Sequence, residues 1–124
     1  YKLELYRRFA GLDYGEKDDL LDEIIDRFGE PPEEVEVLWR VACLRALCRL
    51  LHIRGISVKP GELRITFAEN AAIDPTALMK LISEQQQYMN FKSGVQAQLI
   101  FRTVKLKTDS LTWLEKNLPR LAFD

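Results

Sequence analysis

The chain has 124 residues, 47% of them hydrophobic and 30% charged, which is typical of an ordinary globular domain. A chain of this length can bury a core without disulfides or metals, so we expect a single domain spanning residues 1–124. No apolar run is long enough to cross a membrane and no signal peptide is visible, so we expect a cytoplasmic protein. Cys43 and Cys48 lie in one predicted helix at a spacing that does not favour a mutual disulfide, so we expect both to be reduced thiols.

Charge is unevenly distributed along the chain, although the formal net charge is only −1. Residues 1–36 hold 12 acidic and 5 basic side chains, a net charge of −7. Residues 37–124 hold 7 acidic and 13 basic side chains, a net charge of +6. Such asymmetry is typical of a docking surface or an intramolecular contact, but a solvated helix face followed by a mildly basic remainder gives the same counts.

Residues 2–10 predict a helix with Leu3, Tyr6 and Ala10 on one side. This helix begins without a lead-in, so we interpret the chain as excised from a longer protein. Residues 17–28 predict an amphipathic helix. Its inner face is expected to contain Leu20, Leu21, Ile24, Ile25 and Phe28, and its acidic residues Asp19, Asp22, Glu23 and Asp26 lie almost opposite.

Residues 32–52 predict a long central helix. Gly29 supplies the stop signal for the preceding helix and Pro32 the start signal for this one. The long helix has two apolar stripes, one formed by Val35, Trp39, Ala42, Ala46 and Leu50 and the other by Val37, Val41, Leu44, Cys48 and Leu51. A surface helix has one such stripe, so we expect this helix to be packed between other elements, with Trp39 and Leu44 in the core.

The remainder of the chain predicts two β-hairpins interleaved with helices. The first hairpin turns at Pro60-Gly61, and the second is expected between strands at 88–91 and 95–101. Asp74 and Asp109 are predicted helix N-caps. The fold class is therefore α+β: N-terminal helices with a long central helix, then two hairpins that form an antiparallel sheet interleaved with helices.

No pattern of catalytic, cofactor-binding or metal-binding residues is present, so we expect that this domain is not an enzyme and has no cofactor of its own. Glycines are scattered at turns and form no phosphate-binding loop. Cys43, Cys48 and His52 do not provide the four ligands that structural zinc needs. The carboxylates of Asp22, Glu23 and Asp26 lie on an outer helix face, which does not favour the raised pKa of a general acid.

Nucleic-acid binding is the alternative function. Basic residues between Arg40 and Arg64 could form a patch after folding, and Phe67, Phe91 and Phe101 could stack on bases if they were exposed. These aromatic residues alternate with polar ones, as core-facing strand positions do, and the isoelectric point near 5.9 does not favour a dedicated binder. We therefore expect no direct nucleic-acid contact.

The segment EIIDRFG at residues 23–29, followed by Pro32, resembles the C-terminal domain of bacterial transcription-repair coupling factors. Supporting matches are KLELYRR at 2–8, LHI at 51–53, ITF at 65–67 and Asp74-Pro75. The resemblance covers most of the chain and is looser after Lys105. His52 departs from the family pattern, because a glycine is usual at that position.

The resemblance implies a regulatory, autoinhibitory domain of a large ATP-driven DNA translocase. The translocase would remove stalled RNA polymerase and recruit nucleotide excision repair, with ATP and magnesium in an upstream motor. The C-terminal domain would dock on a UvrB-like module of the same protein, mask the surface that binds UvrA, and restrain the motor. The expected docking residues are Glu23 and Asp26, supported by Asp19 and Asp22. The resemblance implies that the acidic residues of the 23–29 motif lie on the face proposed to meet the UvrB-like module.

Overall fold

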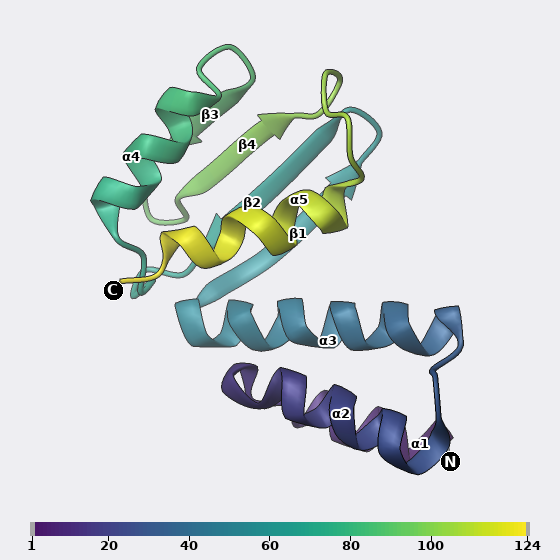
Figure 1. Ribbon diagram of the computed structural model, residues 1–124. Helices are drawn as coiled ribbons and strands as arrows, with labels where there is room; N and C mark the ends of the chain where they lie inside the picture. Colours follow the sequence, from purple (N-terminus) through teal and green to yellow (C-terminus); the bar gives the residue numbers. More distant parts are fainter. Residues whose placement is uncertain (1, 124) are drawn as a thin grey trace. The chain divides into compact units, whose positions relative to one another are not determined.

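The computed structural model describes residues 2–123, without the side chain of Lys2, and contains five α-helices and four β-strands (Figure 1). The elements in chain order are α1 (Lys2–Ala10), α2 (Lys17–Phe28), α3 (Glu33–Leu51), β1 (Ile53–Lys59), β2 (Glu62–Phe67), α4 (Pro75–Glu84), β3 (Met89–Lys92), β4 (Gln98–Arg102) and α5 (Ser110–Asn117). Short 3-10 helices cover Tyr14–Glu16 and Leu118–Leu121. This order confirms the α+β class. The chain divides into two compact units, Tyr1–Leu47 and Cys48–Asp124.

The first unit contains α1, α2 and most of α3 around one apolar cluster. α1 contributes Leu5 and Phe9, which are 5% and 7% exposed, whereas Leu3 and Tyr6 are 64% and 49% exposed. The side of α1 that carries Leu3 and Tyr6 is therefore exposed, and the buried side carries Leu5 and Phe9 instead. Leu5 and Phe9 are four residues apart, and the same spacing on a helix places two side chains on one face.

α2 contributes Leu20 and Ile24 to this cluster, at 5% and 1% exposure. Ile25 and Phe28 remain 37% and 41% exposed, so the predicted inner face is correct at Leu20 and Ile24 but too wide. The buried stripe is narrower and shorter than predicted: Ile25 lies to one side of the line through Leu20 and Ile24, and Phe28 continues that line but is the last residue of α2.

α3 places Val35, Ala42 and Ala46 in the same cluster. Trp39 is only partly buried, and its Nε1 donates a 2.9 Å hydrogen bond to the backbone oxygen of Lys17, which ties α3 to the start of α2. Leu44 is also partly buried, and Val37 and Leu50 are 40% and 57% exposed. The expectation that both stripes of α3 are buried, with Trp39 and Leu44 in the core, therefore holds only in part, since each stripe has an exposed residue at one end.

The second unit contains one antiparallel sheet with strand order β1-β2-β4-β3. β2 and β4 occupy the centre, and their inward residues are at most 4% exposed: Leu63, Ile65, Phe67, Leu99 and Phe101. α5 lies over this face in Figure 1, with the Trp113 ring centroid 4.7 Å from that of Phe101. The sheet confirms the predicted pairing of two hairpins.

Local signals define the ends of the elements in this unit. Gly61 has a φ of 78°, as the third position of a type II turn requires, so the Pro60-Gly61 turn is confirmed. Asp74 and Asp109 accept hydrogen bonds from the backbone nitrogens of Thr76 and Thr112, at 3.0 and 2.7 Å, and are N-caps as predicted. β4 begins at Gln98 rather than at residue 95, so the second hairpin has a longer loop than predicted.

Candidate docking surface on the second helix

Three of the four predicted docking carboxylates are exposed on α2. Asp19, Asp22 and Asp26 are three or four residues apart, which places them along one side of the helix. Among residues 3–123, no side-chain hydrogen bond or ion pair engages any of these three carboxylates. Leu20 and Ile24 anchor the helix from the opposite side, so the three carboxylates stand on a firmly packed element and present a continuous acidic stripe.

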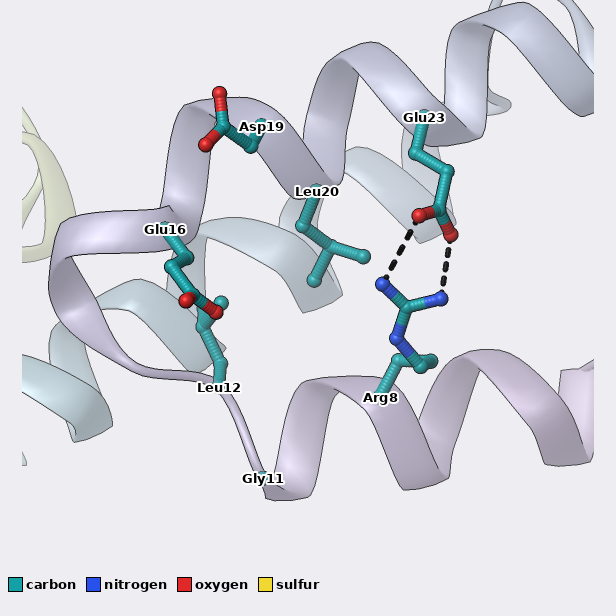
Figure 2. A pocket seen from close by; sticks show the side chains of 7 residues that line it. All are labelled: Arg8, Gly11, Leu12, Glu16, Asp19, Leu20 and Glu23. Atoms are coloured by element: carbon teal, nitrogen blue, oxygen red, sulfur yellow. Dashed lines mark hydrogen bonds and ion pairs between the residues drawn. The ribbon is translucent and has the colours of Figure 1, made fainter.

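The fourth carboxylate, Glu23, is already engaged. Arg8 on α1 donates hydrogen bonds from Nη1 to Oε2 and from Nη2 to Oε1 of Glu23, so both carboxylate oxygens are bound (Figure 2). The hydrogen bonds and charge of Arg8 hold the pKa of Glu23 below its ordinary value, and Glu23 in turn raises the pKa of Arg8. Glu23 thus belongs to a contact between α1 and α2 that sequence reasoning did not identify.

A second ion pair joins the same two helices. Arg27 on α2 donates a 3.1 Å hydrogen bond to Glu4 on α1. Glu4 pairs with Arg27, and Arg8 pairs with Glu23, so the sequence numbers rise along α1 while they fall along α2. The two helices are therefore antiparallel, and each contributes one acidic and one basic side chain. We call these two pairs the seam. Both lie at the surface of the helical unit, whose buried cluster contains Leu5 and Phe9 of α1 together with Leu20 and Ile24 of α2.

A polar pocket of about 280 Å³ opens beside the seam. Its lining residues are Arg8, Gly11, Leu12, Glu16, Asp19, Leu20 and Glu23. Figure 2 shows Asp19 projecting away from Arg8, on the outer side of α2. Glu16 was not among the predicted docking residues, although its spacing of three from Asp19 is a signal that it shares this end of α2.

The aromatic residues considered for nucleic-acid stacking do not form an open platform. Phe67 and Phe101 are each 4% exposed on the inner side of the sheet, and Phe91 lines an apolar groove of about 380 Å³ together with Phe67 and Leu78. Arg64 donates hydrogen bonds to Gln98 and to Glu62, and the Glu62 carboxylate offsets the positive charge of Arg64. Phe67 and Phe101 are therefore too buried to stack on bases, and Phe91 is only partly exposed.

The described part of the chain contains no cluster of three or more His, Cys, Asp or Glu residues arranged to hold a metal ion. Cys43 and Cys48 form no disulfide, and burial raises the pKa of the Cys48 thiol to about 11. Within residues 2–123, no helix has the length and apolar character needed to span a bilayer.

The fold and its surface define a class: an α+β domain with a helical unit that carries an acidic stripe and a second unit built on a four-stranded antiparallel sheet. Residues 1–78 match the TRCF domain family. The chain therefore belongs to that family, the C-terminal domain of transcription-repair coupling factors.

Three curated relatives are transcription-repair-coupling factors of bacteria. The chain is 37% identical to that of Bacillus subtilis (strain 168) over 83 residues, which are 64% of this chain and 7% of the relative. It is 31% identical to that of Myxococcus xanthus over 86 residues, 68% of this chain and 7% of the relative. Identity to that of Escherichia coli (strain K12) is 27% over 121 residues, 97% of this chain and 10% of the relative. The chain thus spans at most a tenth of their length.

A solved structure, the crystal structure of a C-terminal domain of transcription-repair coupling factor, resembles this chain with a TM-score of 0.72. The similarity covers 97% of this chain and 80% of the solved one, at 22% sequence identity. It shows that the two chains share a fold.

Proposed function

We propose that this chain is the autoinhibitory C-terminal domain of a transcription-repair coupling factor, and that the acidic stripe of α2 is its docking surface. In this proposal the domain docks on a UvrB-like module of the same protein, masks the surface that binds UvrA, and restrains an ATP-driven DNA translocase. The motor and its ATP and magnesium lie in the parent protein. The domain itself supplies contact surface and no chemistry.

The proposal rests on the exposure of Asp19, Asp22 and Asp26 and on their lack of ion-pair partners. They are exposed, spaced along one side of α2, and without ion-pair partners among residues 3–123. Each is available to accept charge-assisted hydrogen bonds from arginines of a partner. A single exposed ion pair is worth little, but several pairs shielded together at an interface can shift a docking equilibrium.

Charge reversal at Asp22 and Asp26 tests this function in the full-length parent protein. The variant Asp22→Lys/Asp26→Lys should dock poorly, so the basal ATPase rate and the affinity for UvrA should both rise. These two positions are chosen because neither takes part in the seam, whereas Glu23→Lys would also break the pair with Arg8.

A matched control separates docking from a general charge effect. Glu69 is exposed and lies in the second unit. Glu69→Lys makes the same charge change as the single variant Asp26→Lys, with which it is compared, and half the charge change of the double variant. The control should leave the ATPase rate and UvrA affinity as they are. If Asp22→Lys/Asp26→Lys folds normally but the parent protein stays as restrained as before, the acidic stripe is not the docking surface.

A further inference from the structure

Within the seam, Arg8 of the domain itself binds Glu23, which is one of the four expected docking carboxylates. Arg8 uses both terminal nitrogens of its guanidinium to bind both oxygens of Glu23. This two-bond geometry is the one by which an arginine from another protein would recognise a carboxylate. A partner arginine can reach Glu23 in that geometry only if Arg8 leaves.

The pair is also accessible to exchange. The side chains of Arg8 and Glu23 are 44% and 41% exposed, so they can separate without opening the core. After separation, α1 remains held to α2 by the buried side chains of Leu5 and Phe9 and by the second seam pair, Glu4–Arg27. Arg8 is therefore dispensable for packing α1 on α2, although it occupies Glu23.

We propose that Arg8 competes with the docking partner for Glu23 and thereby weakens docking. This inference rests on the proposed function and goes beyond it, because it separates the acidic residues into two groups. Asp19, Asp22 and Asp26 are open to a partner at once, whereas Glu23 becomes available only in exchange for Arg8. The Arg8–Glu23 pair would thus limit the affinity of the domain for its docking partner.

The decisive variant is Arg8→Ala in the full-length parent protein. It should strengthen docking, because Glu23 is released and the local surface becomes more negative. The basal ATPase rate and the affinity for UvrA both report the undocked fraction, so each should fall, by about 2- to 5-fold for the loss of one competing surface pair. A purely structural role of Arg8 predicts the opposite sign, since a loosened α1–α2 contact would release the motor.

A double-mutant cycle identifies the group through which Arg8 acts. In a Glu23→Gln background the competition is removed, so adding Arg8→Ala should leave the ATPase rate and UvrA affinity nearly unchanged. If Arg8→Ala has the same effect in both backgrounds, Arg8 does not act through Glu23 and the inference is overturned.

Two control variants address charge and packing. Arg7 is exposed on the same helix, and Arg7→Ala removes the same unit charge without releasing Glu23, so its effect should be clearly smaller. Glu4→Ala breaks the other seam pair and should not tighten docking. An equal fall for Arg7→Ala would assign the effect to net charge instead of competition.

The outcomes distinguish this inference from the proposed function. If Asp22→Lys/Asp26→Lys releases the motor and Arg8→Ala restrains it further, both stand. If the aspartate variant releases the motor but Arg8→Ala leaves the ATPase rate unchanged or raises it, only the proposed competition is overturned. Failure of the aspartate variant to release the motor overturns the proposed function, and the inference with it.

Discussion

His52 occupies a backbone conformation that favours glycine. Its φ is 56°, in the left-handed region, directly after the end of α3, where glycine commonly terminates helices. The imidazole Nδ1 lies 3.0 Å from the backbone oxygen of Asn70 and donates to it, since a carbonyl oxygen only accepts. The family resemblance places a glycine at this position, and the φ angle supplies the physical reason for that preference.

Substitution of His52 separates strain from hydrogen bonding. Both His52→Gly and His52→Ala lose the bond to Asn70, but only alanine retains a Cβ in the left-handed region. The glycine variant should therefore be more stable than the alanine variant by about 1 kcal/mol. Urea unfolding of the two variants measures this difference, and equal stabilities would show that the left-handed backbone carries no cost here.

Cys48 should react slowly as a nucleophile in the folded chain. Burial raises the pKa of its thiol to about 11, so the thiolate is a small fraction at pH 8. Alkylation of Cys48 by iodoacetamide at pH 8, followed by mass spectrometry, should be much slower in buffer than in urea. Equal rates in the two conditions would contradict a buried thiol.

At the scale of elements, α2 offers two adjacent isoleucines in opposite environments. Ile24 is 1% exposed and Ile25 is 37% exposed, although the sequence assigns both to the inner face. Ile24→Ala should cost about 2–5 kcal/mol of the free energy of unfolding, and Ile25→Ala about 1 kcal/mol or less. Denaturant unfolding of the two variants compares them, and equal costs would contradict the observed orientation of α2.

The seam should respond to acid in a defined direction. Arg8 lowers the pKa of Glu23 in the folded chain below the ordinary value of 4.5. A lowered carboxyl pKa contributes stability that is present above pH 4.5 and is lost as the pH falls through the folded value. The stability difference between the wild-type chain and Arg8→Ala should therefore be present at pH 7 and shrink steadily below pH 4.5.

Thermal unfolding of both chains at several pH values measures this difference. Arg7→Ala serves as the comparison, because Arg7 is on the same helix and forms no ion pair with a carboxylate among residues 3–123. A difference that grows in acid would contradict the Arg8–Glu23 pairing.

At the scale of the whole molecule, the proposed restraint should depend on salt. The acidic stripe consists of exposed charges, and their attraction to a partner is screened when the Debye length falls from about 8 Å at 0.15 M salt to about 3 Å at 1 M. The basal ATPase rate of the parent protein should rise with salt concentration. The rate of Asp22→Lys/Asp26→Lys should change much less, and a parallel rise in both proteins would contradict an electrostatic docking surface.

The order of the elements and many of their ends could be predicted from the amino-acid pattern alone. Gly29, Pro60-Gly61 and the caps Asp74 and Asp109 act through bonds and backbone angles within a few residues, so their meaning is local and can be predicted from spacing. The EIIDRFG segment at 23–29 likewise pointed to the family that residues 1–78 match. The acidic side of α2 was predicted correctly as an exposed surface at Asp19, Asp22 and Asp26.

The apolar stripe that each short helix buries, and the contact of Glu23, could not be predicted from local pattern. α1 has an apolar pair at Leu3 and Tyr6 and another at Leu5 and Phe9, and periodicity alone does not choose between them. Glu23 and Arg8 are 15 residues apart, and no local rule relates them. Both outcomes depend on how α1 and α2 pack against each other, because burial and ion pairing between helices are set by contacts distant in sequence.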